Sequence, residues 1–377
     1  MKSVLLEFMT TDNKTIIFVI RQDWEEKGIK DKEPLVFEAD FNEQDVVDCV
    51  KEIRALYDEW RDKKYKPEYL DKIRLEDRTS FYDIGHKIFN DELMRAIDGY
   101  ELIYFVPFSA LHHLPLHAMR DSSGVDIIDR FACSYLPSAS VLQFVNKSKE
   151  RPKEFNFKGI GVDALNQNSK VFVQEISKIE TNDTFFTKKF LITSEEATKD
   201  SFFLDNEKFN ILHCSAHGYF SNTNPLESSI MLFIPEEHRP NSLEELEKQM
   251  NHQNTLLKDY SVSVNELISR LNSSFELVFL SACVSGENKN EAGDELIGLS
   301  RGLFYSGTKS MILALFTVDK QITGNRKSNT YIKKFYQFWI EKRQYKAKAF
   351  QNYIKIIKED YKHPFYWFPY ILIGNPY

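Results

Sequence analysis

The chain has 377 residues, 42% of them hydrophobic and 28% charged, which is the composition of a globular protein and excludes a disordered chain. Its net charge of −7 and pI near 5.8 leave no basic field for a phosphate backbone, so we expect no direct nucleic-acid partner. No apolar stretch approaches the roughly 18 residues of a membrane span, and the N-terminal segment has no signal-peptide cleavage site, so we expect a soluble, cytoplasmic protein without membrane contact.

The first 150 residues combine strand-like runs with a long amphipathic helix. The helix is predicted over 43–63 from the helical spacing of its apolar residues. The strand-like runs are 3–8, 15–20, 34–38 and 101–106. The charged segment 147–157 contains a proline and lacks apolar periodicity, so we interpret it as a linker that ends an N-terminal domain, 1–150.

In the second domain, predicted over 151–377, short apolar runs alternate with helical stretches. The runs are 158–162, 189–192, 209–213, 276–280, 309–315 and 369–373. This alternation is typical of βαβ units and predicts an α/β fold, with a mainly parallel sheet flanked by helices on both faces.

Local signals mark several helix ends in this second domain. Thr193 with Glu196, and Ser263 with Glu266, have the spacing of a capping box, in which each side chain satisfies an otherwise orphaned amide. Gly307 is placed to close a helix that precedes it, because a glycine tolerates the left-handed conformation found there.

Reactive residues follow two of the predicted strands. In a parallel α/β sheet, ligands and catalytic groups gather in the crevice at the carboxyl ends of the strands. The run 209–213 leads into His217-Gly218, and the run 276–280 leads into Cys283. If these strands are neighbours, an imidazole and a thiol face each other across the crevice. This is the arrangement that a cysteine nucleophile and its base require.

His217 and Cys283 are therefore the predicted catalytic residues. The thiolate attacks a carbonyl, and a free cysteine with a pKa of about 8.5 is mostly protonated at neutral pH. His217 is expected to take the proton and return it to the leaving amine. The amides of Gly218 and Cys283 are expected to stabilise the oxyanion, Gly218 because it lacks a side chain. No acid stands out as a partner for His217, so the sequence favours a dyad.

The neighbouring cysteines and histidines have structural interpretations. Four scattered cysteines predict free thiols in a reducing compartment, and Cys214 is expected in the core. His213 and His217 are four residues apart, like zinc ligands on a helix, but their segment is predicted as strand and turn. We therefore predict no metal and no cofactor.

Five blocks follow one another along the chain: LIYFVPFSALHHLPLHAM (102–119), HCSAHG (213–218), LVFLSACVSG (277–286), GLSRGLFYSGTKSMILALFTVD (298–319) and HPFYWFPYILIG (363–374). With them the chain resembles the CHAT domain family, whose fold and chemistry look like those of caspases and separases. The family's histidine, cysteine and oxyanion donors fall on His217, Cys283 and Gly218. Departures from the family pattern are Ala216 in place of Thr, Val284-Ser285 in place of an acid and Thr, and Phe316 in place of Trp.

The resemblance also implies a substrate-binding segment and a non-catalytic N-terminal half. The segment after the strand that follows the cysteine helix would pair with the substrate backbone, and here it includes Phe316, Thr317 and Val318. Asp319 is the candidate for receiving a basic side chain before the scissile bond, and Asp163 is a second candidate. The histidines of the first block and the aromatic run of the last block are expected to serve packing: His112, His113, His117 and Phe365-Tyr366-Trp367-Phe368.

We therefore expect a cysteine endopeptidase that cleaves a dedicated protein partner, preferably after a basic residue. By analogy with the family, the setting would be bacterial antiviral defence or regulated cell death, with a gasdermin or a CRISPR-associated protein as substrate. A separate activating protein is expected, and the polar insertion 236–259 is one place where it could act. The alternatives are a catalytically silent scaffold or binding module and, less favoured, a metal-dependent hydrolase.

Overall fold

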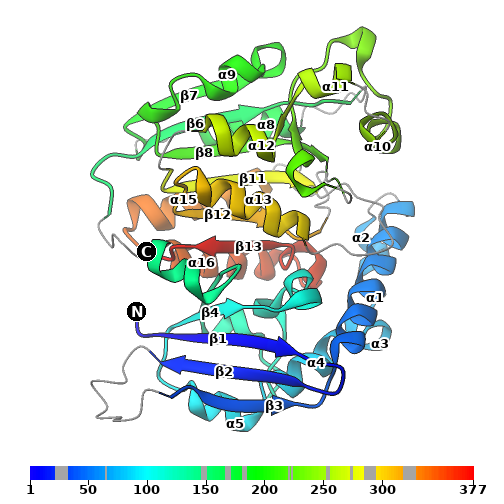
Figure 1. Cartoon of the computed structure of the whole chain (residues 1–377), viewed down its shortest axis with the longest axis vertical. Helices are drawn as coiled ribbons and strands as arrows, with labels where there is room; N and C mark the ends of the chain where they lie inside the picture. The colour runs from blue at the N-terminus through cyan, green and yellow to red at the C-terminus, as the bar shows by residue number, and fades with distance from the viewer. Residues whose placement is uncertain are drawn as a thin grey trace. The chain divides into compact units, whose positions relative to one another are not determined.

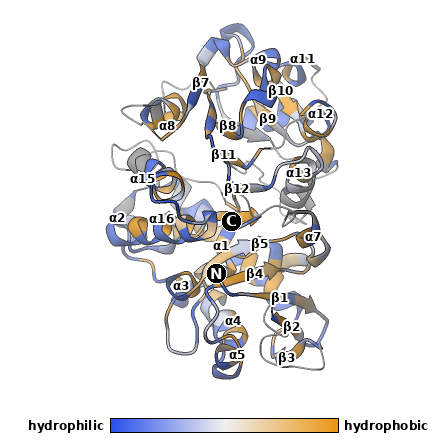
Figure 2. Ribbon diagram, turned by 90° about the vertical axis from the view of Figure 1, so that its left-hand side faces the viewer, coloured by the Kyte–Doolittle hydropathy of each residue, from blue (hydrophilic) through white to orange (hydrophobic). Residues whose placement is uncertain are grey.

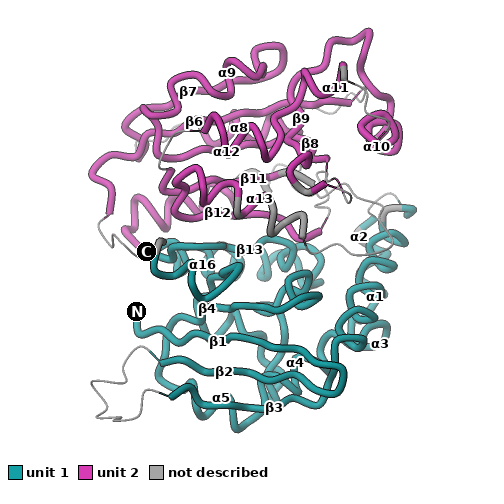
Figure 3. Tube along the Cα trace, viewed as in Figure 1, with its two compact units in different colours: residues 1–146, 345–376 teal, residues 147–344, 377 magenta. Residues whose placement is uncertain are grey.

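Two units divide the chain in the computed structural model (Figure 3). Unit 1 comprises residues 1–146 and 345–376, and unit 2 comprises 147–344 together with residue 377. The structure describes all residues except 22–32, 64–65, 146–150, 166–170, 181–184, 220, 222–223, 252–254, 272–274, 284–293 and 317–327. No helix in the part of the chain that it describes is both long and apolar enough to cross a lipid bilayer.

Unit 1 is built on a mixed sheet of six strands in the order β13-β5-β4-β1-β2-β3. The strands are β1 (Ser3–Thr10), β2 (Thr15–Arg21), β3 (Leu35–Ala39), β4 (Leu102–Val106), β5 (Ala132–Tyr135) and β13 (Tyr370–Gly374). Neighbouring strands from β13 to β1 are parallel, and the β1-β2-β3 ribbon is antiparallel. Because β4 and β5 are central, every residue of both strands is buried, and Figure 2 shows β4 largely in the colours of hydrophobic residues.

The helices of unit 1 include the predicted amphipathic helix, which packs through Val46, Ile53 and Leu56. Figure 1 shows this helix, α1, along one side of the unit. The helices and short turns are α1 (Glu43–Asp62), α2 (Pro67–Leu70), α3 (Leu75–Arg78), α4 (Phe81–Ile88), α5 (Asp91–Ala96), η1 (Ser109–His113), η2 (Leu116–Ala118), α6 (Ile127–Arg130), η3 (Ala139–Val141), α7 (Leu142–Val145), α16 (Lys346–Asp360) and η9 (Pro364–Tyr366).

Unit 2 holds a parallel sheet in the order β7-β6-β8-β11-β12, with a short antiparallel extension from β8 through β9 to β10. The strands are β6 (Asn156–Gly161), β7 (Lys188–Thr193), β8 (Ile211–Tyr219), β9 (Ser229–Met231), β10 (Ser261–Ser263), β11 (Leu277–Cys283) and β12 (Ser310–Ala314). Parallel strands with helical connections confirm the predicted α/β class.

Helices cover both faces of the unit 2 sheet. They are α8 (Val171–Glu180), η4 (Ser194–Glu196), α9 (Lys199–Phe203), η5 (Asn206–Lys208), η6 (Pro225–Glu227), η7 (Glu236–His238), α10 (Leu243–Asn251), α11 (Thr255–Asp259), α12 (Val264–Arg270), α13 (Asp294–Tyr305), α15 (Ser328–Tyr336) and the π-helical turn η8 (Gln337–Glu341). Figure 2 shows α8 and α15 on one side of the strands, with α12 and α13 on the other. Because α8 and α15 share a face, they can reach the same row of strand residues.

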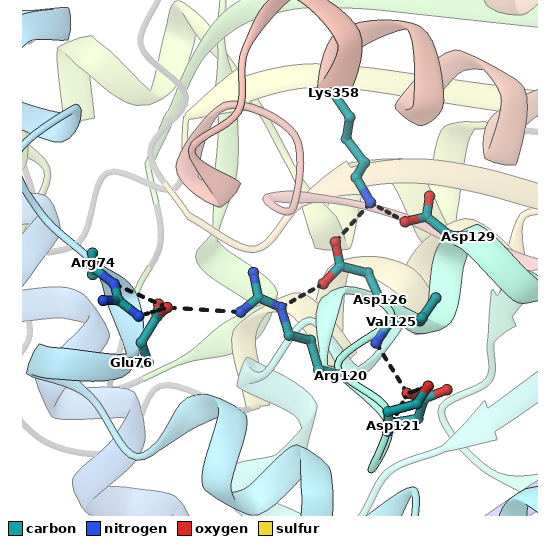
Figure 4. A network of polar contacts seen from close by, with 9 residues as sticks. Arg74, Glu76, Arg120, Asp121, Val125, Asp126, Asp129 and Lys358 are labelled. Carbon is teal, nitrogen blue, oxygen red and sulfur yellow. Dashed lines mark hydrogen bonds and ion pairs between the residues drawn. The ribbon is translucent and has the colours of Figure 1, made fainter.

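The C-terminal segment belongs to unit 1, which differs from the predicted division at residue 150. The boundary itself lies close to the prediction, but β13 pairs in parallel with β5, and Ser134 Oγ donates to the Gly374 carbonyl at 2.8 Å. Lys358 of α16 also binds Asp126 at 2.7 Å and Asp129 at 2.5 Å (Figure 4). These contacts join residues more than 200 positions apart, so a local sequence pattern could not predict them.

The predicted helix ends are confirmed at two places and wrong at a third. Ser263 and Glu266 form the capping box of α12, and Gly307 has φ +94° two residues after α13. Thr193 caps no helix with its side chain. The capping box of α9 is instead Thr198 with Ser201, five residues downstream.

Candidate active site

The carboxyl ends of β6, β8 and β11 form the candidate active site. β8 and β11 are parallel neighbours, as the sequence analysis required, and their register pairs Ala216 with Ala282 and His217 with Cys283. Adjacent strands lie about 4.8 Å apart, so the backbones of the predicted base and nucleophile are immediate neighbours. The side chain of Cys283 lies outside the described part of the structure.

β8 continues through His217 to Tyr219, whereas the sequence predicted a strand that ends near residue 213. The extension arises from pairing on both sides. β11 runs beside β8 as far as Cys283, and β9 pairs antiparallel with Gly218 and Tyr219. His217 is therefore held in a strand, with only 6% of its surface exposed.

An acid contacts His217, although none was predicted to do so. Asp163 follows β6, the strand on the other side of β8, and its Oδ1 lies 3.2 Å from His217 Nε2. Both side chains are largely buried, with 8% of His217 and 14% of Asp163 exposed. A carboxylate at this distance fixes the orientation of an imidazole and favours its protonated form.

The ring of His217 also packs against Phe172 of α8, with ring centroids 4.6 Å apart in an edge-to-face arrangement. This contact depends on a close approach of α8 to β6. A Cβ added at Gly161 would lie 2.8 Å from the Phe172 carbonyl oxygen and 3.1 Å from Val173 Cα, which no side chain could tolerate without a shift of the helix. Gly161 therefore lets α8 bring Phe172 to the site.

The structure describes two of the remaining predicted site residues, Gly218 and Phe316, but not the other three. Gly218, the proposed oxyanion donor, lies in β8 in register with Ile230 of β9. Phe316 follows β12 and is buried, with 6% of its surface exposed. Thr317, Val318 and Asp319 lie outside the described residues.

Most of the residues given structural interpretations are buried, whereas His112 and His113 are partly exposed. Cys214 is a fully buried thiol. His213 bonds Glu175 and Tyr336. His117 bonds the hydroxyl of Tyr135. The described residues contain no group of three or more His, Cys, Asp or Glu side chains arranged to hold a metal ion.

The sequence held one usable signal for the contact between Asp163 and His217. Alternate residues of a strand share a face, so Gly159, Gly161 and Asp163 line up on the side of β6 that α8 covers. The register pairs Gly159 with His213 and Gly161 with Ser215, and one further step along both strands brings Asp163 level with His217. Only the order of the strands, which periodicity does not give, was missing.

Comparisons with known proteins agree with the resemblance found in the sequence. The model of the CHAT domain family matches residues 86–375, which is most of the chain. No curated protein matched. Two chains from crystal structures of the Saccharomyces cerevisiae separase–securin complex are similar at 11% and 12% identity, with TM-scores of 0.48 and 0.44. They cover 76% and 80% of this chain, which in turn spans only 16% and 18% of theirs, and a likeness at this level carries no functional argument.

Proposed function

This chain belongs to the CHAT domain family, which supports a caspase-like peptidase, and we propose that unit 2 is a cysteine endopeptidase with His217 and Cys283 as base and nucleophile. The observation that carries the proposal is the register of β8 and β11, which pairs these two residues at the carboxyl end of a parallel sheet. The carboxylate 3.2 Å from His217 Nε2 adds support, because it can orient the imidazole and stabilise the imidazolium that forms when the thiol gives up its proton.

In the proposed reaction, His217 takes the thiol proton of Cys283 and the thiolate attacks the peptide carbonyl carbon. The amides of Gly218 and Cys283 stabilise the oxyanion of the tetrahedral intermediate. When the intermediate collapses, the C–N bond breaks and His217 returns the proton to the leaving amine. His217 then takes a proton from water, and the resulting hydroxide attacks the thioester. The acid product leaves, and Cys283 regains its proton.

Asp163 is proposed to hold His217 for both proton transfers. If Nε2–H donates to Asp163, the lone pair on Nδ1 is the one that accepts the Cys283 proton. The imidazolium that forms after this transfer is stabilised by the same carboxylate. In this proposal Asp163 therefore acts on the base, rather than on the substrate as predicted from the sequence.

For the substrate, we propose a protein partner that pairs with the segment after β12, with Phe316, Thr317 and Val318 at its backbone. Asp319 would receive a Lys or Arg side chain before the scissile bond. A dedicated cytoplasmic target in bacterial defence or cell death, such as a gasdermin or a CRISPR-associated protein, and a separate activating protein complete the proposal. These features rest on the family resemblance.

Cleavage of a diverse peptide library by the wild type and by Cys283→Ala tests the proposal. We expect the variant to lose at least about 10³-fold in rate, because it lacks the nucleophile. Cys214→Ala is the matched control, because Cys214 is a buried thiol on the neighbouring strand that the proposed reaction does not use. Its rate should stay close to that of the wild type.

Three results would contradict parts of this scheme. No cleavage under any activating condition would count against the peptidase. A biological effect that survives Cys283→Ala would favour the catalytically silent scaffold. A preference for acidic residues before the cut would overturn the role of Asp319.

A further inference from the structure

A buried polar cluster lies in unit 2, a few residues before the candidate dyad along β8 and β11. We call it the Glu175 cluster, and its members are Glu175, His213, Ser281 and Tyr336. Glu175 Oε1 lies 2.9 Å from His213 Nε2, and Ser281 Oγ donates to Glu175 Oε2 at 3.1 Å. The hydroxyl of Tyr336 lies 2.9 Å from His213 Nδ1. Glu175, His213 and Tyr336 are completely buried, and Ser281 is 3% exposed.

The cluster joins four elements of unit 2. Glu175 comes from α8, His213 from β8, Ser281 from β11 and Tyr336 from α15. Each carboxylate oxygen of Glu175 has one donor, so a single side chain binds both strands of the candidate dyad. The ring of His213 also stacks on Phe279 of β11, with centroids 4.5 Å apart and planes 2° from parallel.

Because the cluster is buried, the loss of one of these hydrogen bonds would cost much free energy. A buried carboxylate that loses its donors leaves an unpaired polar group, which costs far more than the bond contributes in water. An apolar residue of the same size would fill this position without that risk, so the cluster is poorly explained by stability alone. Its geometry is better explained by a role in holding the neighbouring strands and helix in position.

The cluster lies close to the dyad along both strands. His213 precedes His217 by four residues on β8, and Ser281 precedes Cys283 by two on β11, so in each strand the pair shares a face of the sheet. Glu175 follows Phe172 by three residues, which is nearly one turn of α8, and Phe172 packs on the His217 ring. A shift of Glu175 therefore moves the neighbours of the base.

We propose that Glu175 is a positioning residue for the His217 and Cys283 pair. By binding His213 and Ser281 together, it fixes β8 against β11 and seats α8 so that Phe172 packs on the base. This inference rests on the proposed function, because it assigns Glu175 to the same site.

The test measures the thiolate character of Cys283 directly, without a substrate. Cys283 in the full chain is alkylated with iodoacetamide from pH 5 to 9, and mass spectrometry reads the rate at that cysteine. We expect the wild type to react well below pH 8.5, the usual pKa of a thiol, because the neighbouring imidazole stabilises the thiolate. In Glu175→Leu the profile should move up by about one pH unit, which is about a tenfold slower reaction at pH 6.

Two companion variants separate positioning from folding. Glu175→Gln keeps the shape of the side chain. Its amide oxygen can accept from His213, and its amide nitrogen can donate to Ser281 Oγ, so this variant should recover most of the wild-type profile. Lys158→Met is the matched control. Lys158 is fully buried on β6 and donates three bonds, to the Phe202 and Leu204 carbonyls and to Asn206, on the α9 side of the same sheet. It should destabilise unit 2 without moving the profile.

Each outcome decides between the two levels of the proposal. A wild type that titrates like a free thiol overturns the dyad, and the role of Glu175 with it. A wild type with a lowered profile that Glu175→Leu leaves unchanged overturns the positioning role alone, as does an equal shift in Lys158→Met. If Glu175→Leu does not fold, Ser281→Ala, which removes one bond of the cluster, must shift the profile in the same direction by about threefold in rate at pH 6, or the inference fails.

Discussion

The two units of this chain end their parallel strands in different chemistry. In unit 1, β4 ends at Val106, before Pro107, and β5 is followed by Leu136 and a second proline. In unit 2, the corresponding edge carries Asp163, His217 and Cys283. In an open α/β sheet, ligands bind at the carboxyl ends of the strands. Of these described strand ends, those of unit 2 carry the groups that can move protons. The sheet therefore supplies a position, and the residues at the strand ends decide whether it becomes a site.

Their buried histidines differ in the same way. In unit 1, His117 faces the neutral hydroxyl of Tyr135 at 3.0 Å, and burial, with a smaller contribution from Lys358, lowers its pKa to about 3. In unit 2, His213 and His217 each face a carboxylate. An anion beside a histidine stabilises its charged form, whereas burial against a neutral hydroxyl keeps His117 neutral. A carboxylate alone does not identify a base, because His213 has one as well; His217 differs in lying in register with Cys283.

The largest expected effect is acid destabilisation of unit 1. Below pH 6.5 an unfolded chain protonates His117, but the native state does so only near pH 3, so stability is lost as the pH falls through this window. From pH 7.5 to 4.0, His117 alone should account for about 3 kcal/mol of the free energy of unfolding. His113, with its pKa lowered to about 3 mainly by burial, adds to the loss.

Urea unfolding at the two pH values, read by pulsed hydrogen exchange in peptides from β4 and β5, checks this expectation. His117→Asn keeps an acceptor for the Tyr135 hydroxyl but cannot be protonated. Its loss of stability between pH 7.5 and 4.0 should be smaller than that of the wild type by about the same 3 kcal/mol. An identical loss of stability in both proteins would contradict the claim that neutral His117 causes the acid destabilisation of unit 1.

The second effect concerns Asp163 and sharpens its assignment to the base. Asp163→Ala should lower kcat about 100-fold, or about 2.7 kcal/mol, with KM nearly unchanged, because the imidazole loses its orientation and its anion. Asp163→Asn keeps an oxygen that accepts from His217 Nε2–H, so its loss should be smaller. Steady-state kinetics on the best library peptide measure both. A rise in KM at unchanged kcat would instead return Asp163 to substrate binding.

Local patterns in the sequence predicted most strands of both units. The run 101–106 became β4, and 309–315 became β12, because a buried strand must be apolar along its whole length. A general rule about the carboxyl ends of parallel strands singled out His217 and Cys283, but that β8 and β11 are neighbours was only a condition of the prediction, which the structure meets. The residues at those ends could therefore be chosen before the structure was known.

What the sequence did not reveal depends on contacts between distant residues. β8 runs six residues past its predicted end because β9 and β11 supply partners there. The pairing of β13 with β5 likewise joins Ile373 to Tyr135, and no periodicity encodes it. Asp163 and Glu175 were missed as partners of histidines for the same reason, since each acts across the sheet.

The smallest effect tests whether close packing of α8 matters to the site. Gly161→Ala places a Cβ 2.8 Å from the Phe172 carbonyl oxygen, so α8 must move outward. We expect a loss of about 1–2 kcal/mol in stability and about a fivefold fall in kcat, because Phe172 leaves the His217 ring. Gly85→Ala in unit 1 is the matched control, with its Cβ 3.0 Å from Met119 Cβ and 3.1 Å from the Arg120 carbonyl oxygen. If Gly85→Ala lowers kcat as much as Gly161→Ala does, the packing of α8 does not specifically affect His217.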